Sequence, residues 1–191
     1  MTMRADVRIE TERLILRPTQ AEDFKGWAEM MADPETARFI GGVQPAAQAW
    51  RGMMTMAGAW HLTGVAMFSV IEKATGRWVG RLGPWTPLGW PGTEVGWGLH
   101  RAAWGKGYAT EGAAAAMDYA FDVLGWNEVI HCIDPENTPS ARVAERLGSR
   151  MIGPVTMPPP FEHMPVNAWG QSREEWAKNR LSVTRPPAGR P

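Results

Sequence analysis

The segment Gly92 to Gly112 constrains the fold most, because it joins a strand, a glycine-containing loop and an alanine-rich helix. Gly105 and Gly107 permit positive φ and a close approach of the backbone to a ligand. The N–H groups of such a loop and the dipole of the helix after it favour an anion, and Lys106 adds a positive charge. The segment therefore predicts a site for a phosphate or pyrophosphate between a strand and a helix.

Two common phosphate-binding motifs do not match this loop. A P-loop has Ser or Thr after its lysine, whereas Gly107 follows Lys106 here. A dinucleotide-binding fingerprint has a third glycine, and Thr110 stands at that place. A pair of turn glycines without a ligand is the alternative that a lone Gly-x-Gly leaves open.

The rest of the chain alternates between strand and helix patterns, without repeats. Strands are expected over 7–17, 65–72, 78–84, 93–100, 127–133, 150–157 and 166–170. Helices are expected over 20–32, 45–62, 105–124 and 139–147, and a capping box at Ser172 and Glu175 opens the last one. This mixed order favours an α/β (α+β) class with a mixed sheet and helices on its faces. We expect one domain over residues 1–183 and a disordered tail over 184–191.

Composition excludes several classes of function. The 191 residues carry 20 basic and 20 acidic side chains, so a nucleic-acid-binding surface, which needs a basic excess, is not expected. The single cysteine, Cys132, excludes an intramolecular disulfide, and four scattered histidines show no metal-ligand spacing. No signal-peptide pattern and no apolar run of ~18 residues is visible. We therefore expect a cytoplasmic, metal-free protein that does not span a membrane.

Three motifs, in order along the chain, resemble the GNAT superfamily of N-acetyltransferases. The stretch WGKGYATEG after EVGWGLH resembles their acetyl-CoA-binding motif, and IETERLILRPTQAED resembles the opening strand and helix of one branch. That branch includes ribosomal-protein N-terminal acetyltransferases, and Asn137-Thr138-Pro139-Ser140 resembles its N-x-x-S helix. The resemblance covers about residues 8–180. It implies the GNAT fold, whose central, mostly antiparallel mixed sheet has splayed middle strands and helices on both faces.

The resemblance implies acetyl-CoA as cosubstrate and assigns the residues that bind it. The pyrophosphate would be wrapped by Ala103, Trp104, Gly105, Lys106, Gly107, Tyr108 and Ala109. The pantetheine arm would lie along the backbone of Trp97, Gly98 and Leu99 and bond to Asn137. The family motif begins with Gln or Arg where this chain has Ala102. That departure puts little in doubt, because backbone N–H groups make most of the contacts.

The implied reaction is direct attack of a neutral primary amine on a thioester. An ammonium with pKa ~10.4 costs about 4–5 kcal/mol to deprotonate at pH 7, whereas an α-amine of pKa ~7.7–8 costs about 1 kcal/mol. A general base is therefore needed more for side-chain amines than for N termini. Glu94, at the start of the splayed strand, is the candidate base, and a surface glutamate is the alternative.

Ser140 is the candidate acid or sulfur contact, because related enzymes with the N-x-x-S motif are thought to use this serine. A hydrogen bond in the first turn of the helix is the alternative. Many GNAT members use a tyrosine seven residues after the asparagine, and this chain has Ala144 there.

The acceptor is the open question, and the tryptophans bear on it. Trp60, Trp85 and Trp90 fall in segments where this fold builds its acceptor cleft, so they are predicted to contact the acceptor or a homodimer partner, with simple packing as the alternative. Trp27, Trp97 and Trp126 are expected in the core. The acceptor amine is either a protein N terminus or a small molecule. The alternative function is a non-catalytic acyl-CoA-binding or protein-interaction module on the same fold.

Overall fold

A computed structural model describes residues 7–183 of the chain. Its centre is one eight-stranded sheet in the order β1-β2-β3-β4-β5-β6-β8-β7. The strands are β1 (Ile9–Glu10), β2 (Leu14–Arg17), β3 (Phe68–Glu72), β4 (Trp78–Trp85), β5 (Glu94–Leu99), β6 (Glu128–Ile133), β7 (Arg150–Val155) and β8 (Val166–Ser172). The expected disordered tail, 184–191, lies outside the described residues.

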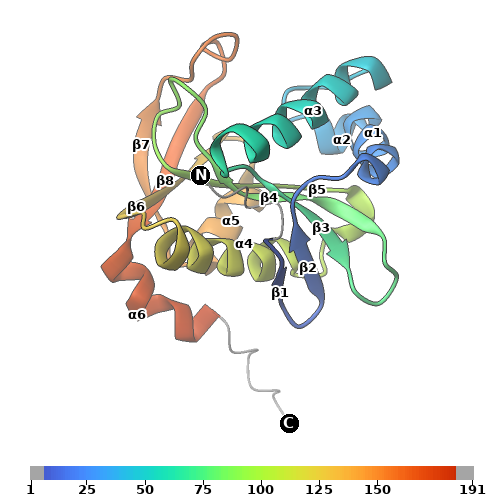
Figure 1. Ribbon diagram of the computed structural model, residues 1–191. Coiled ribbons are helices and arrows are strands. Elements are labelled where there is room, and N and C mark those ends of the chain that lie inside the picture. The colour runs from blue at the N-terminus through green and yellow to red at the C-terminus, as the bar shows by residue number, and fades with distance from the viewer. Residues whose placement is uncertain (1–6, 184–191) are drawn as a thin grey trace.

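Helices cover both faces of this sheet (Figure 1). They are α1 (Phe24–Ala32), α2 (Pro34–Ala37), α3 (Ala46–Thr63), α4 (Tyr108–Asp118), α5 (Thr138–Arg146) and α6 (Arg173–Val183). Figure 1 shows α1, α2 and α3 on one side of the sheet and α4 on the other. The predicted α/β architecture, with a mixed sheet between helices, is confirmed. None of the described helices is long and apolar enough to span a membrane.

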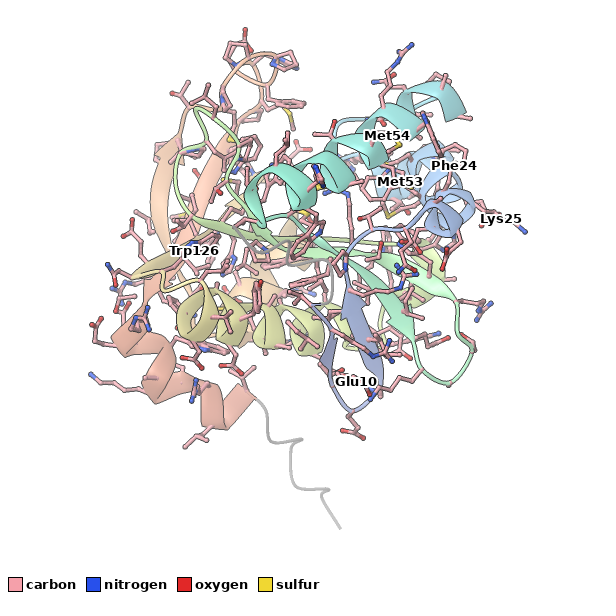
Figure 2. The ribbon with its side chains drawn as sticks, viewed as in Figure 1. Glu10, Phe24, Lys25, Met53, Met54 and Trp126 are labelled. Carbon is pink, nitrogen blue, oxygen red and sulfur yellow. The ribbon has the colours of Figure 1, made fainter. Side chains whose placement is uncertain are left out.

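Small residues let α4 approach the sheet. A Cβ on Gly112 would lie 2.5 Å from Leu82 Cδ2 of β4, so any larger residue would force the helix outward. Ala113 and Ala116 on the same helix are fully buried. On the other face, α1 packs on α3, with Phe24 and Met53 at this contact (Figure 2). The site is therefore built on a sheet held firmly from both sides.

The main differences from the sequence prediction each have a local reason. Residues 7–17 form two strands, because Thr11 N–H bonds to Leu14 O in a tight turn and folds the segment into a hairpin. Helix α2 was not predicted, although Pro34 stands in its first turn and the Asp33 carboxylate accepts from Glu35 N–H. The long helix starts at Tyr108, after the loop that holds Gly105 and Gly107.

The middle of the sheet opens between β5 and β6. All other neighbouring strands pair antiparallel, but β5 and β6 run parallel and share one register pair, Glu94 with Ile130. The two strands then separate toward Leu99 and Ile133, as expected for splayed middle strands. The gap between them leads into a cavity.

Candidate active site

The cavity has a volume of about 370 Å³ and lies where β5 and β6 separate. Its walls are mostly apolar and aromatic, and they include Phe39, Ile40, Trp85, Leu88, Trp90 and Phe161. The polar and charged side chains that line the same space include Arg81, Glu94, His131, Asp134, Asn137 and Ser140. A few polar groups converging in an apolar pocket of this size are typical of a small-molecule site.

Glu94 is buried at the floor of this cavity, with 5% of its surface exposed. Trp90 donates from Nε1 to Glu94 Oε2 over 2.5 Å, and Cys132 N–H donates to Oε1 over 3.0 Å. Burial raises the pKa of Glu94 to about 7, although these two donors and the Arg81 cation favour the charged form. The surface-glutamate alternative is therefore wrong, and a carboxylate that titrates near neutrality is suited to general base work.

Two glycines of β5 clear the space beside this carboxylate. A Cβ on Gly96 would lie 2.7 Å from Met67 Cε and 3.1 Å from Glu94 Oε1. A Cβ on Gly98 would lie 3.5 Å from Ile40 Cδ1. Glycine at these two positions therefore lets the Met67 and Ile40 side chains lie directly against β5, which explains a strand with so few side chains of its own.

Ser140 and Asn137 lie at the start of α5, on the opposite wall. The Asn137 side chain caps this helix by accepting from Ser140 N–H over 3.2 Å. Ser140 Oγ in turn accepts from Trp97 Nε1 over 3.2 Å. The Trp97 side chain packs against the hydrophobic core, as expected, and it also lines the cavity. Both residues of the N-x-x-S motif face the same space as Glu94.

His131 and Cys132 of β6 complete the polar floor. His131 is 1% exposed, its Nδ1 lies 2.7 Å from Val95 O and its Nε2 lies 2.9 Å from Ser149 Oγ. Burial lowers the pKa of His131 to about 4, so the ring is neutral at pH 7 and Nδ1 carries the proton that the carbonyl accepts. Burial also raises the pKa of the Cys132 thiol, so this cysteine is not a nucleophile.

The glycine loop lies between β5 and α4, as the sequence predicted. Gly105 and Gly107 both adopt positive φ, of 74° and 79°, on either side of Lys106. Tyr108 and Ala109 then open α4, whose first N–H groups have no partner within the helix. Alternating left-handed glycines before a helix N-terminus make a concave surface of N–H groups that fits a pyrophosphate.

Two side chains far away in sequence, Arg13 and Glu72, hold this loop, and no local sequence pattern predicts their roles. Arg13 Nη1 donates to Lys106 O over 2.8 Å, while Arg13 is itself paired with Glu111 of α4. Buried Glu72 accepts from Tyr108 OH over 2.7 Å and pairs with Lys106 Nζ at 3.3 Å. Contacts between residues 34 to 98 positions apart leave no local pattern that could have revealed them.

The other cofactor residues surround the same gap. Ala103 is buried, while Trp104 is half-exposed and donates from Nε1 to Leu99 O over 2.8 Å. The backbone of Trp97, Gly98 and Leu99 forms the side of β5 that faces the gap, since their pairing with β4 leaves the opposite edge without a strand.

Of the three tryptophans assigned to the acceptor cleft, two line the cavity and one does not. Trp85 and Trp90 both line the cavity, with ring centroids 6.4 Å apart in an edge-on arrangement. Trp60 is 7% exposed, donates from Nε1 to Met67 O and packs on Phe68, outside the cavity lining. Trp60 is thus a core residue, and its assignment to the acceptor cleft was wrong.

Comparison with known proteins agrees with this geometry. Residues 13–150 match the family described as the acetyltransferase (GNAT) domain. The chain belongs to the GNAT acetyltransferase family. The resemblance inferred from the sequence motifs is therefore confirmed, and the splayed strands and the glycine loop are the parts of the GNAT fold that the motifs predicted.

Individual relatives extend the match over most of the chain. The uncharacterized N-acetyltransferase p20 of Bacillus licheniformis is 34% identical over 148 residues, which cover 75% of this chain and 82% of that protein. The crystal structure of an acetyltransferase from Agrobacterium tumefaciens superimposes with a TM-score of 0.76 at 29% identity, covering 87% of this chain and 95% of that one. Mycobacterium smegmatis RimJ in complex with CoA-disulfide shares the fold, with a TM-score of 0.70 at 19% identity and coverage of 89% and 87%.

Proposed function

We propose that this GNAT protein transfers the acetyl group of acetyl-CoA to a primary amine, by direct attack of the amine. The observation that carries the proposal is the buried Glu94 carboxylate, which two N–H donors hold beside the gap between β5 and β6. Acetyl-CoA supplies an acyl group activated as a thioester. A cytoplasmic location, expected from the sequence, remains part of the proposal, and a homodimer partner remains the alternative contact for Trp85 and Trp90.

The residues for binding CoA follow from the shape of the gap. The N–H groups around Gly105, Lys106 and Gly107 would hold the pyrophosphate, together with those of Ala103, Trp104, Tyr108 and Ala109. The free edge of β5, from Trp97 to Leu99, would pair with the pantetheine amides as a strand would. Asn137 caps α5 with its carbonyl oxygen, so its amide N–H₂ group is the part that would reach the pantetheine arm. No metal is needed, and residues 7–183 hold no cluster of His, Cys, Asp and Glu that could bind one.

Two side chains divide the proton transfers between them. Glu94 would accept the proton of the attacking amine, directly or through a water. Ser140 accepts a hydrogen bond from Trp97, so its own hydroxyl proton is available to stabilise the leaving sulfur. Trp85 and Trp90 would contact the acceptor from the outer wall.

The first test separates an enzyme from a binding module. Acetyl-CoA at 100 times its Kd is expected to stabilise the protein by about 2.7 kcal/mol, which raises the Tm by about 5–10 °C for a chain of this length. CoA release should then be measured with peptides, amino acids, polyamines and aminoglycosides. A stabilisation without release on any amine supports the non-catalytic module, and the absence of both refutes the proposal.

Trp90 is expected to act as a positioning residue for the base. Replacing Trp90 with Phe removes the N–H that favours the charged carboxylate, so the pKa of Glu94 should rise. The midpoint of the ascending limb of kcat/KM against pH is expected to move up by about one pH unit.

Trp85→Phe is the matched control for this prediction. It removes an indole from the same wall, but the hydrogen bonds of the Glu94 carboxylate come from Trp90 and Cys132. Its midpoint should stay at the wild-type value. Equal midpoints for wild type and Trp90→Phe would contradict the positioning role.

A further inference from the structure

Arg81 is a cavity residue with a charge that the proposed reaction does not use. It projects from the middle of β4, opposite Gly98 of β5. Its Nη1 donates to Met67 Sδ over 2.8 Å, and the guanidinium lies 5.2 Å from the centre of the Trp27 ring. Its Nε is buried without a hydrogen-bond partner. Among residues 7–183, no carboxylate forms an ion pair with Arg81.

Glu94 interacts electrostatically with the Arg81 cation without forming an ion pair, and within the described residues the one hydrogen-bond acceptor that contacts the guanidinium is the Met67 thioether. A thioether is a weak acceptor, and a contact with an aromatic ring replaces only part of the lost hydration. Burial lowers the pKa of Arg81 to about 10, so the side chain is still charged at pH 7. Buried charges in folded proteins are normally paired, because an unpaired one costs several kcal/mol. An anion that enters the cavity would supply the missing partner.

Arg81 and Glu94 face the same cavity floor, with Met67 between them. In the register of β4 and β5, Arg81 lies opposite Gly98 and Trp85 lies opposite Glu94. Because Arg81 and Trp85 are four residues apart on β4, Arg81 and Glu94 project from the same face of the sheet. Met67 Cε lies beside the space above Gly96, next to Glu94 Oε1, and Met67 Sδ contacts Arg81. The flexible Met67 side chain thus fills the space above Gly96 between the two charged groups, and a molecule that contacts both Glu94 and Arg81 would take its place.

Arg81 lies on the acceptor's side of this floor. The pantetheine arm would run along the edge of β5 that faces β6, beside Asn137 and Ser140. Arg81 reaches the cavity from β4, on the other side of β5, where Ile40 and Met56 cover the floor. An anion bound by Arg81 would accordingly belong to the acceptor.

We propose that Arg81 binds a carboxylate of the acceptor, and that the acceptor is a free α-amino acid with an apolar side chain. The inference rests on the proposed acetyl transfer. An α-amino acid carries its amine and its carboxylate on one carbon, and Arg binds carboxylates with two parallel hydrogen bonds. The walls around Trp85, Leu88 and Phe161 suit an apolar side chain. A protein N terminus has a neutral amide at this place and would leave the guanidinium unpaired.

Binding of reaction products tests this proposal without turnover. N-acetyl-L-leucine and N-acetyl-L-phenylalanine, and the amide of each, are titrated by calorimetry into the protein saturated with CoA. Wild type should bind each acid roughly tenfold to hundredfold more tightly than its amide, the range for hydrogen bonds to a charged group. Arg81→Met should bind acid and amide equally, and Arg81→Lys should retain part of the preference.

The control is Arg51→Met, which removes an exposed arginine of α3 outside the cavity lining. It should keep the wild-type preference for the acids. The thermal shift with CoA checks that each variant is folded. Equal affinity of wild type for acid and amide with both side chains would overturn the proposal, and so would an acid preference that survives in Arg81→Met.

Turnover assays distinguish this inference from the proposed function. The KM of wild type should be lower for L-leucine and L-phenylalanine than for their amides and for peptides with the same N-terminal residue, and Arg81→Met should remove the difference. The amine of an amino acid and the amine of its amide differ in pKa, which also changes the KM. This contribution is the same in wild type and in Arg81→Met, so it cancels when the two proteins are compared. Acid binding without CoA release from any amine would refute only the acetyl transfer. A preference for succinyl-CoA that depends on Arg81 would assign the carboxylate to the acyl donor and overturn the inference.

Discussion

Replacing Glu94 with Gln is expected to lower the rate of acetyl transfer to a strongly basic amine by about 10²–10⁴-fold. The variant keeps the size of the side chain and one oxygen that can accept from Trp90 or Cys132, but it cannot take up a proton. The loss should grow with the pKa of the acceptor, because an amine of pKa ~10.4 costs about 4–5 kcal/mol to deprotonate at pH 7 and one near 8 costs about 1 kcal/mol. CoA release from a series of amines with graded pKa measures this slope.

The pH dependence gives a second readout of the same variant. Since burial raises the pKa of Glu94 to about 7, the kcat/KM of wild type should rise as pH increases through 7 and the carboxyl loses its proton. The variant should show only the ascending limb that belongs to the amine. A wild-type profile in Glu94→Gln would refute the assignment of Glu94 as the base.

As pH rises, the free energy of unfolding of wild type should fall while its kcat/KM rises. The pKa of Glu94 rises from its usual 4.5 to about 7 on folding, so between these values the native state holds a proton that the unfolded chain has lost. The free energy of unfolding therefore falls as pH rises through this range, by about 3 kcal/mol from this one group. A glutamine amide stays neutral at every pH in this range, so the stability of Glu94→Gln relative to wild type should increase from pH 5 to pH 8.

Denaturant unfolding at pH 5 and at pH 8 measures this gain. The matched control is Glu128→Gln, which changes an exposed glutamate of β6 and should leave the difference from wild type the same at both pH values. A stability gain that does not grow with pH would mean that Glu94 is already ionised throughout.

The sequence was sufficient for the parts of the site that lie close together along the chain. The strand with Glu94, the loop with Gly105 and Gly107, and the helix start with Asn137 and Ser140 each lie in one short segment. Local composition decides such features, because glycines set the backbone and caps set the helix ends. The family resemblance then placed these segments in one fold, including the splay of the two middle strands.

The sequence was not sufficient for side chains that act across the sheet. Arg13 holds the glycine loop from the turn before β2 and Glu72 holds it from β3, and nothing in their local sequence distinguishes them from surface charges. In the sequence, Arg81 is an ordinary polar position of a strand. Only the structure, in which its Nε is buried without a hydrogen-bond partner, distinguishes it as a candidate ligand-binding residue. Trp60 was misassigned for the same reason, since its packing on Phe68 and its hydrogen bond to Met67 O are not visible in the local sequence.

Gly105 and Gly107 are expected to determine the affinity for CoA. A residue with a Cβ costs about 1–2 kcal/mol in the left-handed region, so replacing both with Ala costs about 2–4 kcal/mol. At Gly105 a Cβ would meet nothing within 4 Å, and at Gly107 it would meet Arg13 Nη2 at 3.4 Å. The obstacle to substitution is therefore mainly the backbone conformation. An exposed loop can relax to negative φ in the free protein, and CoA would then have to restore the strained form.

The double variant Gly105→Ala/Gly107→Ala should accordingly bind CoA about 30-fold to 1000-fold more weakly, with each single variant between it and wild type. Asn tolerates the left-handed region better than Ala, so Gly107→Asn should lose less affinity than Gly107→Ala. Calorimetric titration with CoA measures these differences.

Gly76 provides the control for backbone strain alone. It has a φ of +67° in the turn between β3 and β4, and a Cβ there would also meet nothing within 4 Å. Gly76→Ala should therefore carry a similar conformational cost but leave the Kd for CoA unchanged, because this turn does not contribute to the gap between β5 and β6. An unchanged Kd in the double variant would show that the loop N–H groups do not bind the pyrophosphate. A loss of CoA affinity in the Gly105 and Gly107 variants, with an unchanged Kd in Gly76→Ala, would show that CoA binding depends on the left-handed backbone of this loop and not on backbone strain in general.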